Sequence, residues 1–373
     1  MSPAGFSGNS KTFFHNLRKG EHNMMEMPLY ETNLGKSYLG DYLQLLEQLK
    51  DNAVNLAITS PPFALLRQKE YCNKEQDEYV DWLADFARAL KPKLKHDGSF
   101  VLDLGGAYQK GRPVRSLYNY KILIRFCEQL GYNLAEEFFW NNPSKLPSPI
   151  EWVNKRKIRV KDTVNTVWWF SKSDYPKTNI KNVLVDYSDR MRKLLKDKER
   201  FYTPAKRPSG HDISANFHDN GGALPANLLQ YPNTESNSKY LRCCKAAGLK
   251  GHPARFPVSL PAFFIRFLTD PGDLVLDFFA GSNTTGEAAE MLERRWLAFE
   301  LNREYLAASC FRFVREEDAR GTYEKLLRED KMHIDDGFVA EVTPESARLF
   351  QSALFERTAP YEIFAAKGGN PSG

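Results

Sequence analysis

The sequence predicts an α/β fold built on a mostly parallel, doubly wound sheet, and three observations support this class. From residue 39 onward, short apolar runs alternate with segments of helical periodicity. One apolar run continues directly into a glycine-containing loop that opens a helical segment. The alternation stops at residue 141 and resumes near residue 251. Because strands separated by helices usually pair in parallel, we expect a sheet covered by helices on both faces.

The first part of the chain supplies about half of the expected elements. Residues 1–34 are polar and lack a clear period, so we expect an N-terminal arm there. Gly131 is the expected end of one helix, because glycine readily adopts the left-handed conformation that terminates helices. In order, the expected elements are a helix at 39–49, a strand at 54–59, a helix at 78–94, a strand at 100–104, a helix at 120–130 and a strand at 134–140.

The rest of the chain divides into a lobe, a second α/β segment and a tail. Residues 141–250 contain eight prolines and one convincing strand, at 164–171, which predicts a loop-rich lobe inserted into the α/β domain. We assign residues 35–140 and 251–320 to one α/β domain, and residues 321–373 to a C-terminal appendage. After the lobe we expect a helix at 261–269, a strand at 274–279, a helix ending near 294, a strand at 296–301 and a helix at 303–314.

Composition excludes several classes of protein. No run of 18 apolar residues occurs, so no membrane span is expected, and the first residues lack the apolar core of a secretion signal. The five cysteines form no C-x-x-C pair, which favours reduced thiols in a cytoplasmic protein. The seven histidines lack the spacing of metal ligands, so we expect no metal.

Basic residues concentrate in the middle of the chain. Residues 141–255 hold 22 Lys and Arg against 10 Asp and Glu, whereas the rest of the chain holds 30 against 37. Aromatic residues are interleaved with the basic ones, although we expect Trp168 and Trp169 to belong to the core. A patch of this kind suits nucleic acid, whose phosphates release counterions when a basic surface binds. The alternative is a solvated basic surface.

The glycine-containing loop, Ala-Gly-Ser-Asn-Thr-Thr-Gly at 280–286, is a candidate cofactor site. Ligands of doubly wound sheets bind beyond the carboxyl ends of the strands, where Gly281 allows close approach and a following threonine is expected to cap the helix. Glu300 ends the next strand, where its carboxylate can accept both hydroxyls of a ribose. Asn283 replaces the second glycine of a dinucleotide motif, so a nucleoside without phosphates, such as S-adenosylmethionine, fits better. The alternative is a tight turn beside a solvent-facing glutamate.

A second loop, Thr-Ser-Pro-Pro-Phe at 59–63, follows an apolar strand directly. The exocyclic amine of a base is a poor nucleophile because its lone pair is delocalised into the ring. Ser60 Oγ and the Pro61 carbonyl can accept its hydrogens and free that lone pair, while Phe63 stacks on a base drawn out of the duplex. Asp103 ends a neighbouring strand and is the expected proton acceptor, directly or through Ser60. The alternatives are a simple turn at Ser60 and a structural role for Asp103.

These two loops resemble motifs IV and I of the DNA amino-methyltransferases, in the order that defines the β class. Further stretches, at 105–108, 142–162, 207–212 and 252–257, are similar to the N4-cytosine methyltransferases of CAGCTG restriction–modification systems. The resemblance covers about residues 35–315. It implies a circularly permuted class I S-adenosylmethionine-dependent methyltransferase fold, Rossmann-like, with seven strands of which the last is reversed.

The resemblance also implies roles for individual residues. Ser60 and Asp103 match the catalytic network, in a loop completed by Pro61, Pro62 and Phe63. Expected contacts to S-adenosylmethionine are Asp41 near the adenine, His252, Phe256 and Pro257 beside the methionine part, Glu300 at the ribose, and the loop residues Asp277, Phe278, Phe279, Ala280, Gly281, Ser282, Asn283, Thr284 and Thr285.

The inserted lobe is the expected target-recognition surface, with double-stranded DNA as the partner. Arginine can read guanine bidentately, whereas lysine more often contacts phosphate. The expected DNA contacts are Lys155, Arg156, Lys157, Arg159, Arg207 and His211. We expect a monomer or homodimer, with a cognate restriction endonuclease as a functional rather than physical partner.

Other activities remain open from the sequence. Ser-Pro-Pro is typical of cytosine-N4 enzymes and Asp-Pro-Pro of adenine-N6 enzymes, which leaves adenine N6 as the second choice. No Pro-Cys dipeptide occurs, which argues against the cysteine nucleophile of cytosine-C5 methylation. A non-catalytic DNA-binding protein with the same fold is opposed by the intact Ser60, Asp103 and Glu300, and a nicotinamide-linked enzyme by Asn283.

Overall fold

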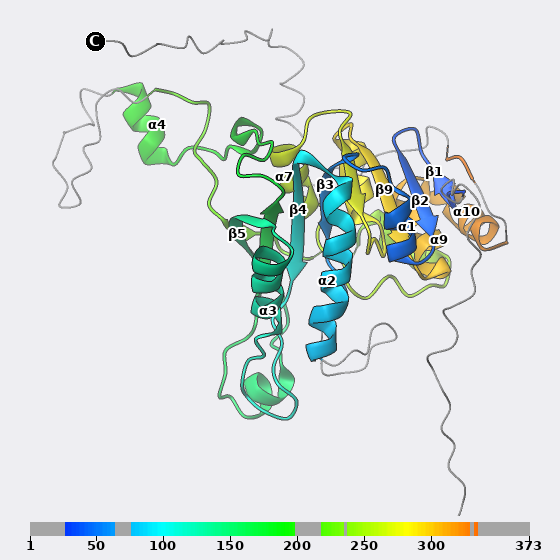
Figure 1. The fold of residues 1–373 in the computed structure, drawn as a ribbon, viewed down its shortest axis with the longest axis horizontal. Helices are drawn as coiled ribbons and strands as arrows, with labels where there is room; N and C mark the ends of the chain where they lie inside the picture. Colours follow the sequence, from blue (N-terminus) through cyan, green and yellow to red (C-terminus); the bar gives the residue numbers. More distant parts are fainter. Residues whose placement is uncertain (1–26, 64–75, 198–217, 235–236, 329–331, 335–373) are drawn as a thin grey trace, which may run out of the picture.

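The computed structural model describes residues 27–63, 76–197, 218–234, 237–328 and 332–334. They form a nine-stranded sheet with helices on both faces (Figure 1). From edge to edge the strands are β1 (Tyr30–Glu31), β2 (Gly35–Leu39), β9 (Arg295–Glu300), β8 (Leu274–Asp277), β3 (Val54–Thr59), β4 (Leu94–Leu104), β6 (Val164–Ser171), β5 (Asn133–Asn141) and β7 (Leu228–Gln230).

Seven of these strands, from β2 to β5 in spatial order, form the expected core. β2, β9, β8, β3 and β4 pair in parallel, and β6 is antiparallel to both of its neighbours. The reversed strand lies in the middle of the chain, as a circular permutation of the fold requires. β1 and β7 extend the sheet at its two edges, antiparallel and parallel respectively.

Helices cover the two faces of the sheet, and each face has its own hydrophobic cluster. On β3, Ala57 packs into one cluster while Leu56 and Ile58 pack into the other, because successive side chains of a strand point to opposite faces. The first face carries α1 (Tyr42–Gln48), α2 (Gln76–Lys93), and α3 (Tyr118–Ile124) with η1 (Arg125–Gln129). The second carries α6 (Lys239–Ala246), α7 (Ser259–Leu268), α8 (Thr284–Met291), α9 (Arg303–Ser309) with η4 (Cys310–Arg312), and α10 (Glu316–Arg328).

Both ends of the folded region extend further than the sequence predicted. The expected helix at 39–49 begins at Tyr42, because residues 35–39 pair with β9 as a strand. Part of the expected N-terminal arm belongs to the sheet edge, where Tyr30 is fully buried and its hydroxyl bonds Ser309 at 2.6 Å. At the other end, α10 runs past residue 320 and buries Tyr323 against the core. An amphipathic helix at this boundary explains why the domain continues beyond it.

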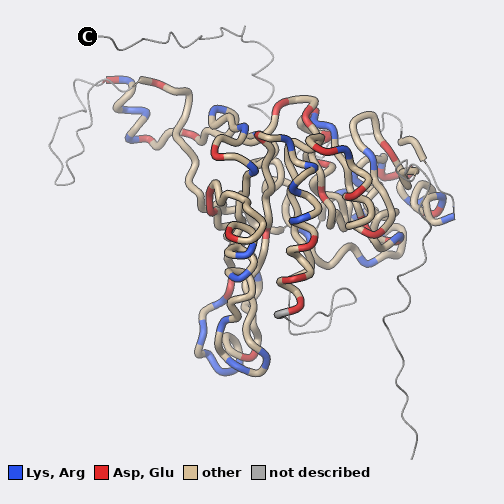
Figure 2. Tube along the Cα trace, viewed as in Figure 1, with Lys and Arg blue, Asp and Glu red and all other residues tan. Residues whose placement is uncertain are grey.

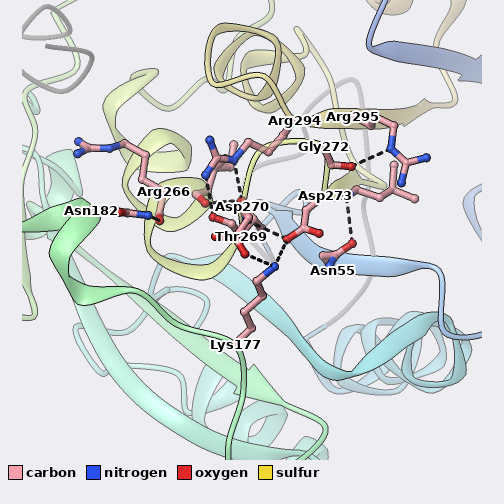
Figure 3. A network of polar contacts seen from close by, with 12 residues as sticks. Asn55, Lys177, Asn182, Arg266, Thr269, Asp270, Gly272, Asp273, Arg294 and Arg295 are labelled. Carbon is pink, nitrogen blue, oxygen red and sulfur yellow. Dashed lines mark hydrogen bonds and ion pairs between the residues drawn. The ribbon is translucent and has the colours of Figure 1, made fainter. Parts of the chain in front are cut away.

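The segment expected to form a separate lobe contributes to the sheet. β6 lies between β4 and β5, and Trp168 and Trp169 are buried in the core as expected. Past β6, Lys177 bonds Asp270 and Asp273, each at 2.6 Å, in the turn before β8 (Figure 3). This ion-pair network fastens the segment to the amino end of β8, opposite the end where the expected cofactor loop begins. The remaining elements of the segment are η2 (Glu151–Lys155), η3 (Ile180–Val183) and α4 (Asp189–Lys196).

Two loop segments, residues 105–117 and 142–163, project together beyond the sheet and are called the finger below (Figure 1). Arg115 of the first segment pairs with Asp162 of the second at 2.6 Å, and Arg159 donates to the Pro113 carbonyl at 2.7 Å. These contacts hold the two segments side by side. No helix among the described residues is both long and apolar enough to cross a bilayer.

Candidate active site

A cavity of about 660 Å³ lies at the carboxyl ends of the central strands. Ser60 and Phe63, after β3, line one part of it, and Gly281 and Glu300, after β8 and at the end of β9, line another. The two loops singled out in the sequence therefore face the same space. This juxtaposition follows from the topology, because parallel strands end at the same edge of a sheet.

Ser60 and Asp103 form a hydrogen-bonded pair in this cavity. The Ser60 hydroxyl donates to Asp103 Oδ2 at 2.9 Å, and the Asn165 amide donates to Asp103 Oδ1 at 3.0 Å. Asp103 is buried, and burial raises the pKa of its carboxyl to about 6, although Asn165, Ser60 and the positive charge of Lys145 oppose the rise. The carboxylate is thus ionised at neutral pH and basic enough to accept a proton.

The rest of the loop after β3 forms an apolar wall. Pro61, Pro62 and Phe63 all line the cavity. Phe63 packs closely on Gly105. A Cβ on residue 105 would lie 2.5 Å from the Phe63 ring, which explains why this position is a glycine. Tyr118 fixes the same turn by donating its hydroxyl proton to the Gly105 carbonyl. An aromatic ring held in this way offers a rigid stacking surface for a planar ligand.

Gly281 brings the cofactor loop against Glu300. Its backbone has φ +51°, and its N–H donates to Glu300 Oε2 at 2.9 Å. A Cβ at this position would lie 2.9 Å from the His252 ring, so a side chain would displace the histidine. Glu300 Oε1 accepts from the Asn302 N–H at 2.8 Å and from the Tyr42 hydroxyl at 3.3 Å. Burial raises the pKa of the Glu300 carboxyl, against these hydrogen bonds.

Asp277 is a structural residue of the loop. It does not line the cavity; instead its carboxylate accepts from Thr59 and Thr285, each at 2.6 Å, and from the Phe279 N–H at 3.1 Å. Burial raises the pKa of Asp277, and these bonds oppose that rise. Asp277 and Thr285 thus tie the cofactor loop to the end of β3, and their expected contacts with the cofactor stay predictions.

Asn283 caps α8, where a threonine was expected to do so. The residue has φ +55°, a left-handed conformation that asparagine tolerates, and its side chain accepts from the Gly286 N–H at 3.0 Å. It is completely buried and does not line the cavity. Asparagine can thus adopt the left-handed backbone conformation for which dinucleotide-binding loops use glycine.

The structure places most of the predicted residues on the cavity. All five catalytic candidates line it, and so do His252, Phe256, Phe279, Ala280, Gly281, Ser282, Thr284 and Glu300. Asp41 does not line the cavity, and its carboxylate caps α1 by accepting from Leu43 N and Gln44 N, so its expected contact with the adenine stays a prediction. The side chain of Phe278 points into the core and stacks on Phe86, so its expected cofactor contact also stays a prediction. Pro257 does not line the cavity either.

Several lining residues were missed by sequence reasoning. Asn165 lies within an apolar strand, so no local pattern marked it, and Tyr42 follows the more conspicuous Asp41. The others come from β5, α9 and several loops, and some are direct chain neighbours of predicted residues. They are Trp140, Asn142, Lys145, Thr163, Asn233, Ala254, Arg255, Leu301, Asn302 and Tyr305.

A buried guanidinium supports the cofactor loop from behind. Arg312 donates to the Ser282 carbonyl at 2.5 Å and to Thr284 Oγ1 at 2.9 Å, and it forms an ion pair with Glu287. Its guanidinium also lies over the Tyr240 ring, 4.8 Å from the centroid. Through these contacts Arg312 holds the loop in place at the start of α8. No local sequence pattern predicted this role for Arg312.

The expected DNA contacts within the described chain lie on the finger. Lys155, Arg156, Lys157 and Arg159 are all exposed there, and Arg156 pairs with Glu151 at 2.9 Å. The finger holds nine Lys and Arg against two Asp and Glu, and its far end shows as a blue cluster in Figure 2. The other two candidates, Arg207 and His211, lie outside the described residues.

Comparison with known proteins identifies the family of the chain. Residues 54–310 match the DNA methylase family. Over 318 residues the chain is 57% identical to the Type II methyltransferase M.PvuII of Proteus hauseri, covering 84% of this chain and 95% of that protein. It is 24% identical over 312 residues to the Type II methyltransferase M.Cfr9I of Citrobacter freundii, covering 77% and 90%. The solved PvuII DNA methyltransferase (cytosine-N4-specific) superposes with a TM-score of 0.69 at 50% identity, covering 83% of this chain and 99% of that chain.

Proposed function

The chain belongs to the DNA methylase family, and from this premise we propose that it transfers a methyl group from S-adenosylmethionine to N4 of cytosine in double-stranded DNA. One observation carries the proposal: a single cavity holds the Ser60–Asp103 pair and the Gly281–Glu300 loop. The Ser60–Asp103 pair offers a proton acceptor, and the Gly281–Glu300 loop offers a binding site for a nucleoside. The identity with a cytosine-N4-specific enzyme favours cytosine over adenine.

The residues around Gly281 fit a nucleoside cofactor. The Glu300 carboxylate is buried at the cavity, and the Gly281 and Asn302 N–H groups and the Tyr42 hydroxyl leave a lone pair on its Oε2, so it can still accept a ribose hydroxyl. His252 and Phe256 line the same cavity and would contact the methionine part. When bound, S-adenosylmethionine supplies an electrophilic methyl group on a positively charged sulfur.

The residues around Ser60 prepare the cytosine amine. Ser60 Oγ and the Pro61 carbonyl accept its hydrogens, which draws the nitrogen toward sp³ geometry, and Phe63 stacks on the flipped base. As the N4–carbon bond forms, the carbon–sulfur bond breaks and its electron pair stays on sulfur. The nitrogen loses a proton to Asp103, directly or through Ser60. Holding both reactants in line supplies much of the acceleration.

The finger is the proposed target-recognition surface, within a lobe at residues 141–250. Its net positive charge suits the phosphates of a duplex, and its base adjoins the cavity through Lys145 and Thr163. We propose CAGCTG as the target, a cognate restriction endonuclease as the functional partner, and a cytoplasmic location on chromosomal DNA. The oligomeric state under this proposal is a monomer or homodimer.

Expression in a host that lacks DNA methylation tests the proposal. Nucleoside analysis and sequencing of the host DNA should find N4-methylcytosine within CAGCTG, and the Asp103→Asn variant should leave the DNA unmodified. N6-methyladenine would overturn the choice of base, and methylation at another sequence would overturn the target. An absence of any modified base, with folded protein present, would overturn the activity itself.

A further inference from the structure

The finger exposes apolar side chains among its charges. Leu146 is 81% exposed and Val160 is 86% exposed, in a projection that holds nine basic residues. Four further apolar residues of the finger are also exposed: Val114, Leu117, Ile150 and Ile158. Single exposed apolar residues need no explanation, but a group on one basic projection marks a surface that becomes covered. The charge complementarity points to a duplex as the covering partner.

Leu146 is adjacent in the chain to the lining of the cavity. It directly follows Lys145, which lines the cavity. The Lys161 ammonium donates to the Pro143 carbonyl at 3.1 Å, and the Asp162 N–H donates to the Ser148 carbonyl at 3.1 Å. The chain carrying Val160 therefore runs beside the chain carrying Leu146, so the two exposed apolar residues lie on adjoining segments.

The local backbone suits a rigid projection. Leu146 precedes Pro147, and two residues later Pro149 follows, so the chain has restricted φ values on both sides of Ser148. The hydrogen bonds from Lys161 and Asp162 fix this stretch to its neighbour. A backbone held this way loses little conformational freedom when the Leu146 side chain enters a partner.

The proposed reaction creates a need for such a side chain. A cytosine that leaves the helix to reach Ser60 opens a gap in the base stack, and the unstacking costs a few kcal/mol. Proteins that distort DNA offset such costs by inserting apolar residues between base steps. A leucine that follows a cavity-lining lysine can enter this gap while phosphates contact the basic residues of the finger.

We propose that Leu146, supported by Val160, is the wedge that enters the DNA stack and fills the space left by the target cytosine. The proposal rests on the proposed function, since it presumes a flipped base. It assigns Leu146 a positioning role, with no contact to the reacting atoms. Its contribution should depend on whether the target base is paired.

The test compares Leu146→Ser on two duplexes, one with the target cytosine paired to guanine and one with it opposite an abasic site. On the paired duplex, we expect kcat/KM to fall about tenfold or more, because the flipping cost is no longer offset. On the duplex with the unpaired target, the variant should match the wild type. Leu146→Met should retain activity on both, because methionine is also apolar and long. Leu224→Ser is the matched control: that leucine is 72% exposed, lies outside the finger and does not line the cavity.

The outcomes separate the wedge from the activity. Equal activity of Leu146→Ser and wild type on the paired duplex would overturn the wedge. An equal loss on both duplexes would also overturn it, because that pattern indicates a defect in binding or chemistry. Failure of the wild type to methylate either duplex would overturn the proposed function instead. A fluorescent base analogue at the target position should brighten with the wild type and less with Leu146→Ser.

Discussion

Replacing Asn165 with leucine tests the role of Asp103 without touching a residue that contacts the reacting atoms. Asn165 is buried and donates a 3.0 Å hydrogen bond to Asp103 Oδ1. Leucine has a similar volume and no donor, so the substitution removes this bond and leaves the Ser60 hydroxyl and the charge of Lys145 to favour the ionised carboxyl. The pKa of Asp103 should therefore rise above its value of about 6 in the native protein.

The size of the effect follows from the hydrogen bond. A bond to a charged group is worth about 1.5–3 kcal/mol, and about 1.4 kcal/mol moves a pKa by one, so the pKa of Asp103 in the variant should be about 7 to 8. At pH 6.5 the ionised fraction, and with it kcat/KM, should fall about three- to 25-fold, whereas at pH 9 the reduction should be about 10% or less.

The assay is the pH profile of kcat/KM for methylation of a duplex, because that ratio reports the free enzyme. The acid limb of Asn165→Leu should lie at higher pH than that of the wild type, with a similar plateau. Thr166→Val is the matched control, since it removes another hydrogen bond between β6 and β4, from the hydroxyl to the Leu104 carbonyl at 2.8 Å. An unchanged acid limb, or a reduction that is equal at all pH values, would refute the assignment of Asp103 as the titrating base.

Three further changes test the cofactor-binding role of Glu300, the DNA-binding role of the finger, and the stabilisation of the cofactor loop by Arg312. Glu300→Gln should raise the Kd for S-adenosylmethionine about tenfold or more in a calorimetric titration, because a neutral amide accepts hydroxyl protons more weakly than a carboxylate. Charge reversal at Arg156 and Lys157 should weaken duplex binding and make its salt dependence shallower, by about one unit of slope for each phosphate that the variant no longer neutralises. Arg312→Met should lower the free energy of urea unfolding by about 3–5 kcal/mol, because Glu287 keeps a charge without its buried partner.

Each of these changes has a control and a contradicting outcome. Glu304→Gln, at an exposed position outside the cavity, should leave cofactor binding unchanged, and an unaltered Kd for Glu300→Gln would remove the ribose role. Charge reversal at Lys50 and Arg320, away from the finger, should change duplex affinity little, and an equal weakening there would indicate a general charge effect. Arg242→Met breaks a more exposed ion pair, so a destabilisation equal to that of Arg312→Met would show that burial is unimportant.

Local sequence patterns predicted the two loops and the sheet that carries them. Ser60 and Gly281 each follow an apolar run, and the rule that parallel strands end at one edge brings them to one cavity. The contact between Ser60 and Asp103 could also be predicted from the sequence, because both residues end neighbouring strands. The assignment to the β class, by the order of the two motifs, came from the resemblance to a known family. Local sequence patterns alone do not give that assignment.

Several side-chain positions at the site are set by three-dimensional contacts that local sequence patterns did not predict. Asp277 and Phe278 are adjacent in the motif, yet one bonds two threonines and the other stacks in the core. Asn165 reaches Asp103 only because β6 runs antiparallel to β4, with Asp103 opposite Val167. Arg312 stabilises a loop about thirty residues earlier in the chain. No periodicity or short motif encodes such contacts.

A single-turnover experiment with labelled S-adenosylmethionine tests the central claim most directly. The wild type and Ser60→Ala are each loaded with the labelled cofactor and mixed with excess duplex, and the labelled nucleosides are identified after rapid quenching. The wild type should place the label on N4 of cytosine in one turnover, while Ser60→Ala should retain the cofactor and transfer the methyl group at least about a hundredfold more slowly. Transfer at the wild-type rate by Ser60→Ala, or a label on any other base atom, would contradict the account.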